Sequence, residues 1–152
     1  MARLIARLRT LLFTNVSVRL NLFYYRRVWG MQIGEGTRIS RGAKLDRTFP
    51  GGITIGRDSA ITHGAIIVTH DFVNREHRPV KIGDCCFVGY NAVVLPGVTV
   101  GDHSIIAAGS LVGRDVPPHS VVMGNPARVV EQNIQTGAWG IRLDKGNAVP
   151  AR

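Results

Sequence analysis

An aliphatic residue recurs at every sixth position over most of this chain, and this period constrains the fold more than any other feature. The step of six holds within three groups: Ile33, Ile39 and Leu45; Ile55, Ile61 and Ile67; Ile82, Val88, Val94, Val100, Ile106 and Val112. An amphipathic helix needs apolar residues three and four positions apart, so the period excludes a helix. Small residues, often glycine, follow most of these aliphatics and favour tight turns. Residues 31–130 are therefore predicted to form short strands joined by turns.

Three strand-and-turn units of six residues make one triangular coil, so the twelve aliphatic positions predict an all-β, parallel β-helix of about four coils. Each coil buries its aliphatic residues only by stacking on its neighbours. The step is ten from Leu45 to Ile55 and fifteen from Ile67 to Ile82, so residues 46–54 and 68–81 contain insertions. Both insertions follow the third strand of a coil, which predicts a wall at one corner, with the larger one forming an external loop.

Side chains alternate along a strand, so the residue before each aliphatic points outward. On the first face these residues are polar, whereas the other two faces carry apolar stripes. The second face presents Arg38, Ala60, Phe87 and Ile105, and the third presents Lys44, Ile66, Val93 and Leu111. Exposed apolar stripes indicate an interface, which predicts a closed homotrimer. The alternative is that the terminal segments cover them.

The formal net charge of +9 is unevenly distributed, because residues 1–34 contain six arginines and no acidic residue. Residues 1–30 combine apolar residues at helical spacing with arginine, tyrosine and tryptophan, which predicts a basic amphipathic helical segment. Such a segment either caps the open end of the coils or contacts a membrane surface, and the two are compatible. A nucleic-acid partner is not predicted, because no recognition motif occurs.

No apolar run approaches the roughly 18–20 residues of a membrane span, and residues 11–13 are too short for the core of a signal peptide. The only cysteines, Cys85 and Cys86, are neighbours, so a reducing compartment fits. We therefore expect a cytoplasmic protein, with any membrane contact at the inner surface. Near the other end, Pro117 and Pro118 predict the end of regular strand pairing, and residues 131–152 form an irregular tail.

The run from Ile82 to Val130, which closes in MGNPARVV, resembles the C-terminal coils of sugar O-acetyltransferases in the hexapeptide-repeat acyltransferase family. The resemblance extends upstream through the coils at 33–72. It implies a left-handed β-helix, a homotrimer, and acetyl-CoA as the acyl donor. It also implies a sugar or lipid-linked glycan as acceptor, in surface polysaccharide or lipopolysaccharide biosynthesis.

The resemblance further implies that His70, at the entrance of the larger insertion, is the general base. An imidazole that titrates near neutrality can take a proton from a hydroxyl and pass it to the leaving thiolate, with no acyl-enzyme. The ring needs an orienting partner. Asp71 is adjacent but points to the opposite side in an extended segment, so it either supports catalysis, contacts substrate or fixes the loop. Glu76, Asp46 and a backbone carbonyl are the other candidates.

Further site residues come from the same resemblance. The oxyanion-stabilising backbone N–H falls at Tyr90, and Ala108 stacks above it to leave space for the pantetheine arm. Gly113 and Arg114 match a family pair near the phosphates of the cofactor, and Arg128 is the other phosphate candidate. Around His70 we expect substrate residues, namely Asp46, His63, Arg75, His77 and Arg78. His103 and His119 are interpreted as exposed turn residues.

Three alternatives stay open. The acceptor of the acetyl group is either a hydroxyl or the amine of a nucleotide-linked amino sugar. The even spacing of His63, His70 and His77 raises a zinc enzyme of the carbonic-anhydrase type, which shares this β-helix. The insertion breaks the coil register between His70 and His77, so no metal is expected. A non-catalytic trimeric scaffold at a membrane would bind no acetyl-CoA.

Overall fold

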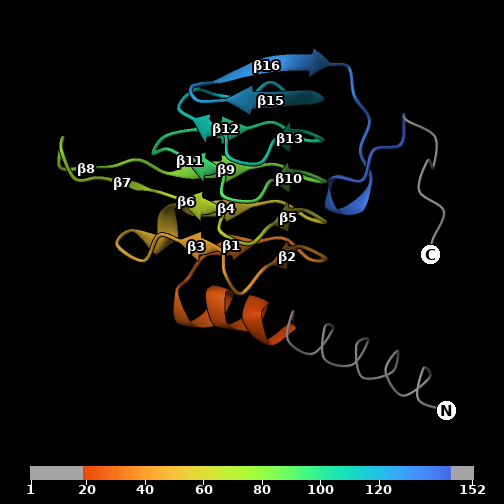
Figure 1. Ribbon diagram of the computed structural model, residues 1–152. Coiled ribbons are helices and arrows are strands. Elements are labelled where there is room, and N and C mark those ends of the chain that lie inside the picture. The colour runs from red at the N-terminus through yellow and green to blue at the C-terminus, as the bar shows by residue number, and fades with distance from the viewer. Residues whose placement is uncertain (1–18, 145–152) are drawn as a thin grey trace, which may run out of the picture.

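The computed structural model describes residues 19–144, which form a three-sided parallel β-helix (Figure 1). We call this stack of coils the prism. Its first face consists of β1 (Gln32–Ile33), β4 (Ile53–Ile55), β9 (Val80–Ile82) and β12 (Thr99–Val100). Its third face consists of β3 (Lys44–Leu45), β6 (Ile66–Ile67), β11 (Val93–Val94) and β14 (Leu111–Val112).

The second face is longer than the other two. It begins with β2 (Arg38–Ile39), β5 (Ala60–Ile61), β10 (Phe87–Val88) and β13 (Ile105–Ile106), and continues with β15 (Ser120–Gly124) and β16 (Ala127–Gln132). Strand β15 pairs with β13 in parallel, and Val116 forms a parallel bridge with Val100. A partial fifth coil therefore follows the four strands of each face.

The prediction that Pro117 and Pro118 end regular pairing was wrong. Both prolines are exposed and lie in the corner turn between the bridge at Val116 and the start of β15. A corner turn requires no ladder hydrogen bond from these residues, so the missing N–H groups do not interrupt the parallel pairing.

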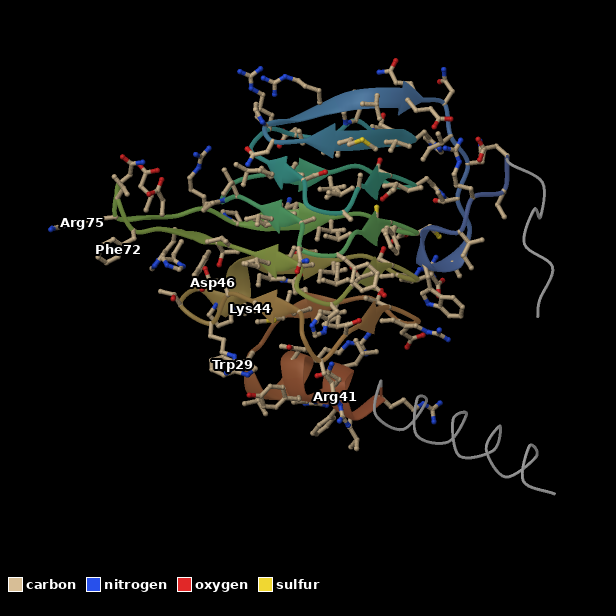
Figure 2. All side chains as sticks on the ribbon, in the orientation of Figure 1. Trp29, Arg41, Lys44, Asp46, Phe72 and Arg75 are labelled. Atoms are coloured by element: carbon tan, nitrogen blue, oxygen red, sulfur yellow. The ribbon has the colours of Figure 1, made fainter. Side chains whose placement is uncertain are left out.

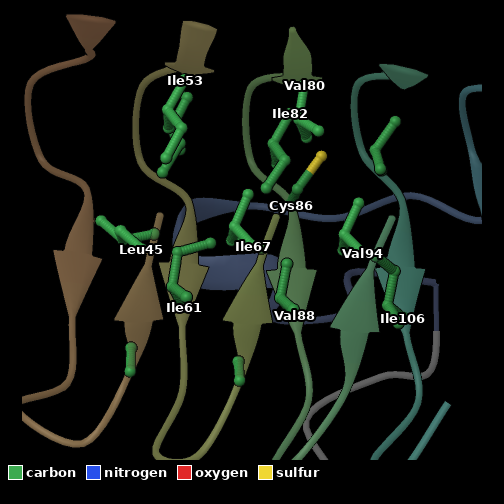
Figure 3. Close-up of a cluster of buried hydrophobic side chains, with 14 of the residues drawn as sticks. Leu45, Ile53, Ile61, Ile67, Val80, Ile82, Cys86, Val88, Val94 and Ile106 are labelled. Carbon is green, nitrogen blue, oxygen red and sulfur yellow. The ribbon is translucent and has the colours of Figure 1, made fainter. Parts of the chain in front are cut away.

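The predicted register of the coils is confirmed on all three faces. Ile33 pairs with Ile55, and Val88 pairs with Ile106, so equivalent aliphatic residues lie one above another. The inner residues form one continuous core (Figure 3) in which Ile61, Ile67 and Val94 are almost fully buried. Burying each such side chain stabilises the fold by about 1.5–3 kcal/mol, and no coil gains this alone.

A helical segment closes the N-terminal end of the prism. Residues 19–23 are helical and continue into η1 (Tyr24–Val28), beneath the first coil (Figure 1). Leu22 and Tyr25 are buried with Met31 in the core, and the Asn21 side-chain amide donates to the carbonyl oxygen of Ile39 (2.9 Å). The described part of the predicted segment 1–30 therefore caps the prism, whereas residues 1–18 lie outside the described residues.

The chain returns along the prism after β16, in a segment that we call the strap (residues 133–143), which contains η3 (Ala138–Gly140). The strap bonds to the stacked turns between the first and second faces. Its contacts are Ile134 to His119, Thr136 to His103 and Cys85, and Trp139 to Asp58 and Gly36. The predicted tail boundary at residue 130 falls inside β16, and the described part of the tail is docked on the prism.

The strap also corrects two expectations. His103 and His119 are half-buried rather than exposed, because their rings stack 4.9 Å apart and each Nδ1 lies about 3 Å from a strap carbonyl oxygen. On the second face, the Arg38 guanidinium lies 3.4 Å from the centre of the Trp139 ring, and Gly140 packs against Phe87. The chain itself therefore covers part of one predicted apolar stripe.

Candidate active site

Both predicted insertions lie at the corner that follows the third face. The first contains η2 (Pro50–Gly52), and the second forms a two-stranded antiparallel arm from β7 (His70–Asp71) and β8 (Glu76–His77). The arm projects from the prism (Figure 1), with Phe72 and Arg75 near its tip and Asp46 near its root (Figure 2). The wall predicted at this corner is therefore present, and the two insertions contact each other.

Asp46, at the start of the first insertion, is the carboxylate that meets His70. Its Oδ2 lies 2.5 Å from His70 Nδ1 and accepts the backbone N–H groups of Thr69 (2.8 Å) and His70 (3.0 Å). Its Oδ1 accepts the N–H of Thr48 (2.8 Å). The Asp46 side chain is only 5% exposed, whereas that of His70 is 34% exposed. A buried carboxylate thus orients a histidine that remains open to solvent.

The hydrogen bonds of Asp46 decide its charge. Burial raises the pKa of this carboxyl, but the hydrogen bonds from His70, Thr48 and Thr69 outweigh burial and hold the pKa far below its usual range. An ionised carboxylate only accepts hydrogen bonds, so His70 Nδ1 carries the proton that faces it. In the neutral ring the Nε2 lone pair is then available, which is the arrangement that a general base needs.

Thr69 and Phe49 complete the contact between the insertions, and sequence reasoning missed both. Thr69 is fully buried, and its hydroxyl lies 3.1 Å from Asp46 Oδ2 and 2.9 Å from the carbonyl oxygen of Phe49. The Phe49 ring stacks on His77, with ring centres 5.0 Å apart and planes 10° apart. The only sequence feature that could have indicated Thr69 is its position next to His70.

Three predicted substrate residues belong to the arm or its root. His77 lies directly opposite His70 in the β7–β8 pair, so these two side chains share one side of the arm. The Arg78 backbone N–H donates to the Thr69 carbonyl (2.9 Å), and its guanidinium packs over Gly97. Arg75 stands in the arm's turn with a positive φ of 55°. All three are exposed, His77 and Arg78 at the root of the arm beside His70 and Arg75 near its tip.

Asp71 has a structural role in the arm. Its Oδ1 accepts the backbone N–H groups of Val73 and Asn74 (3.0 Å each), and its Oδ2 accepts the Asn74 side-chain amide (2.7 Å). These bonds, led by those from Asn74, lower the pKa of Asp71. Asp71 therefore fixes the turn, which was one of its expected roles, while Asp46 orients His70.

Tyr90, Ala108 and His63 lie at a different corner, between the second and third faces. The Tyr90 carbonyl accepts the N–H of Gly109 (2.7 Å), which confirms that Ala108 stacks on the turn of Tyr90. His63 belongs to the turn below, and its carbonyl accepts the N–H of Asn91. Strand β6 separates His63 from His70 along the chain, so the prism does not bring this group to His70 within one chain.

The remaining predicted cofactor residues are divided between two places. Gly113 and Arg114 follow β14 at the corner of His70, and both are exposed. Arg128 stands in β16, where its guanidinium donates to the neighbouring carbonyl of Ala127. Within one chain, the residues expected to bind acetyl-CoA therefore do not lie together.

The arrangement of histidines does not form a metal site within residues 19–144. No group of three or more His, Cys, Asp or Glu side chains in this range is placed to hold a metal ion. His70 is engaged by Asp46, His77 stacks on Phe49, and His63 lies at the other corner. The three evenly spaced histidines thus do not converge.

Known proteins share the repeat and the fold of this chain. Residues 79–114 match the bacterial transferase hexapeptide family (six repeats). Among the curated relatives, the Bacillus subtilis (strain 168) protein YvoF, named as a candidate acetyltransferase, is 36% identical over 108 residues, which span 70% of this chain and 63% of YvoF. In its repeats and its fold, the chain is similar to the hexapeptide-repeat acyltransferases. The repeat and the solved neighbours indicate the left-handed coil of this fold.

Two further relatives differ in the acceptor that their names state. Serine acetyltransferase 2 of Arabidopsis thaliana is 38% identical over 108 residues, 68% of this chain and 33% of that protein. A galactoside acetyltransferase solved in complex with coenzyme A has a TM-score of 0.53 and 29% identity, covering 67% of this chain and 55% of the other. The chain thus spans less than two thirds of each of these relatives.

Proposed function

We propose that this chain is an acetyl-CoA-dependent O-acetyltransferase whose acceptor is a hydroxyl of a sugar or lipid-linked glycan. The observation that carries the proposal is the Asp46–His70 pair, in which a buried carboxylate fixes the ring of a half-exposed histidine. The similarity to hexapeptide-repeat acyltransferases and a coenzyme A complex of a galactoside acetyltransferase support the acyl donor.

The proposed reaction is a direct transfer. The acceptor hydroxyl attacks the thioester carbonyl carbon while His70 Nε2 removes the hydroxyl proton. Asp46 stabilises the resulting imidazolium, and a backbone N–H stabilises the tetrahedral oxyanion. When the C–S bond breaks, the coenzyme A thiolate takes the proton from His70. One ester bond forms, one thioester bond breaks, and the protein returns to its starting state.

We assign the oxyanion donor to the Tyr90 N–H, which forms no hydrogen bond among residues 19–144. Tyr90 and His70 lie at opposite ends of the third-face strands, so a complete site needs a second copy of the chain. The uncovered stripe of Ile66, Val93 and Leu111 runs between these corners and supports side-by-side packing. We therefore propose a homotrimer with its sites between copies.

The surroundings of His70 favour an acceptor with a negative charge. Arg78 is exposed at the root of the arm and Arg75 at its tip, and neither forms an ion pair within residues 19–144. The stacked Phe49 and His77 rings offer a flat surface beside them. Arg114, on the same corner, and Arg128 are proposed for the phosphates of the donor. Because the donor is a metabolite of the cell interior, we place the reaction in the cytoplasm.

The decisive experiment measures thiol release from acetyl-CoA with a panel of neutral sugars, acidic sugars, amino sugars and serine. We expect turnover with a hydroxyl-bearing sugar, and loss of at least about 100-fold in kcat for His70→Ala. The matched control, His119→Ala, removes a histidine from the strap corner and should keep its activity. Turnover by His70→Ala at the wild-type rate would refute the assignment of the base.

Two other outcomes separate the alternatives. Transfer only to serine or to an amino sugar would replace the proposed acceptor while retaining the chemistry. Absence of acetyl-CoA binding in titration calorimetry would instead favour a non-catalytic scaffold.

A further inference from the structure

The capping helix leaves one side unpartnered at the end of the prism. Its Leu22 and Tyr25 face the core, whereas Leu20, Phe23 and Val28 are 62–64% exposed. Positions 20, 23, 24, 27 and 28 are exposed while positions 22 and 25 are buried, so the exposed side chains lie on the side of the helix that faces away from the core. We call this face, together with the neighbouring side chains of the first coil, the base surface. Figure 2 shows Trp29 and Arg41 at this end of the molecule.

The base surface is strongly positive. Residues 19–52 contain seven basic residues, five of them in the helix and the corner turns of the first coil (Arg19, Arg26, Arg27, Arg41 and Arg47) and two on its outer faces (Arg38 and Lys44), against the acidic residues Glu35 and Asp46. Asp46 is buried and engaged by His70, so it does not neutralise the surface. None of the seven forms an ion pair within residues 19–144. Their charge is therefore available to an anionic partner.

The combination of positive charge and exposed apolar side chains indicates which kind of partner the base surface can bind. A second copy docked base to base would bring two such positive surfaces together, which like-charge repulsion opposes. Residues 1–18 add three arginines and no acid, so this segment does not supply the missing negative charge. A nucleic acid would meet the cations but leave Leu20, Phe23 and Val28 exposed to water. An anionic bilayer satisfies both, because aromatic and aliphatic side chains enter the headgroup region while arginines contact lipid phosphates.

We propose that the base surface binds the surface of an anionic phospholipid bilayer. Tyr24 and Trp29 pack edge to face, with ring centres 6.2 Å apart, and Arg47 lies 5.0 Å from the centre of the Trp29 ring, so this end presents the aromatic and cationic groups common at membrane interfaces. No helix within residues 19–144 is long and apolar enough to cross a membrane, so the contact is peripheral. The binding does not depend on the proposed acetyl transfer.

The test is co-sedimentation of the full chain with vesicles. We expect binding to vesicles that contain phosphatidylglycerol, weak binding to pure phosphatidylcholine, and a loss of binding when salt rises from about 0.05 M to about 0.5 M. The variant Phe23→Ser/Val28→Ser should lose at least about tenfold in partition coefficient, because its substitutions remove the side chains that enter the bilayer.

The matched control is Phe72→Ser/Val73→Ser, which removes two apolar side chains of 86% and 88% exposure from the arm tip. This control should bind vesicles like the wild type. Equal binding by Phe23→Ser/Val28→Ser and the wild type, or no preference for anionic vesicles, overturns the proposal. If the wild type fails to bind vesicles but forms a larger assembly that Phe23→Ser/Val28→Ser dissolves, the base surface joins copies of the chain and the proposal is wrong.

Discussion

Every hydrogen-bond partner of the Asp46 carboxylate is a donor. The backbone N–H groups of Thr48, Thr69 and His70 point to it, as do the Thr69 hydroxyl and His70 Nδ1. An amide in its place would turn one NH₂ group toward a donor, leaving both unsatisfied. Asp46 therefore joins folding and function, because the bonds that secure the first insertion also fix the histidine ring.

The first prediction concerns catalysis. Asp46→Asn should lower kcat by about 10²–10⁴-fold, since the ring of His70 loses the acceptor that sets its tautomer and orientation. The KM for acetyl-CoA should change little, because Asp46 is not among the residues proposed to hold the donor. The control Asp71→Asn alters a carboxylate that binds the arm's turn, so its kcat should stay within a few-fold of wild type. Steady-state kinetics with both substrates varied would measure this, and equal losses in the two variants would contradict the positioning role.

The second prediction concerns acid stability. The pKa of Asp46 is lower in the folded chain than in the unfolded chain, where it is about 3.9. Its stabilising contribution is therefore complete well above that pH and declines as pH falls toward the folded pKa. Asp46→Asn should lose about 1–3 kcal/mol of unfolding free energy at pH 7, and the gap to wild type should narrow by pH 3. Urea titrations at several pH values would show this, with Glu76→Gln, an exposed residue of β8, following the wild type.

Among the elements, the strap contributes to stability from outside the repeat. Trp139 contacts the first coil, with its indole N–H donating to the Gly36 carbonyl (2.8 Å) and its ring against Arg38. Since Gly36 belongs to the first coil and His119 to the partial fifth, the strap joins the two ends of the stack. Its interactions should therefore resist fraying of the terminal coils, which have a neighbour on one side only.

The third prediction tests the strap. Trp139→Ala should destabilise the fold by about 1–3 kcal/mol, through loss of one hydrogen bond and the contact with Arg38. The control Ile141→Ala lies two residues away at a side chain that is 55% exposed, and should change stability by less than about 0.5 kcal/mol. Chemical unfolding midpoints would compare the two. Equal midpoints would mean that the Trp139 contacts of the strap add nothing to stability.

At the scale of the whole molecule, the predictable part is what the six-residue period controls. The pairing of Ile33 with Ile55, and of every later aliphatic with its equivalent, follows from the period once the two insertions are recognised. The Asp46–His70 contact was not predictable beyond its corner, because an insertion has no period to fix its path. The strap was missed for the same reason, since residues 133–143 reveal their partners only when the stacked turns exist to receive them.

The fourth prediction concerns assembly. The wild type should have three times the 16.5 kDa mass of one chain in light scattering. Val93→Glu/Leu111→Glu places charges on the uncovered third face and should yield monomers, because an interface cannot bury unpaired carboxylates. Thr99→Glu, which adds a charge to the polar first face, should leave the assembly intact. A monomeric wild type would remove the basis for sites between copies.

The fifth prediction tests those shared sites by mixing. His70→Ala and Ala108→Trp alter different corners, so each variant alone should be inactive. Trimers reassembled from equal amounts should regain about a quarter of wild-type activity, because that fraction of sites combines an intact His70 with an intact neighbouring corner. No recovery after verified reassembly would mean that His70 and Ala108 of the same copy serve one site.

Solenoids usually gain or lose coils freely, since each repeat contacts only its neighbours. The strap removes that freedom here. From the turn of His119 to that of Gly36 the stack rises through four steps of about 4.8 Å, or roughly 19 Å. The strap backbone crosses three of these steps, from Ile134 at the turn of His119 to Trp139 at the turn of Asp58, and the Trp139 indole reaches the fourth at Gly36. Duplicating one coil would move Gly36 too far from Trp139 for their hydrogen bond, and deleting one would leave the strap longer than the stack that it spans. The length of the strap matches the height of the stack, so we infer that the strap fixes the number of coils in this protein.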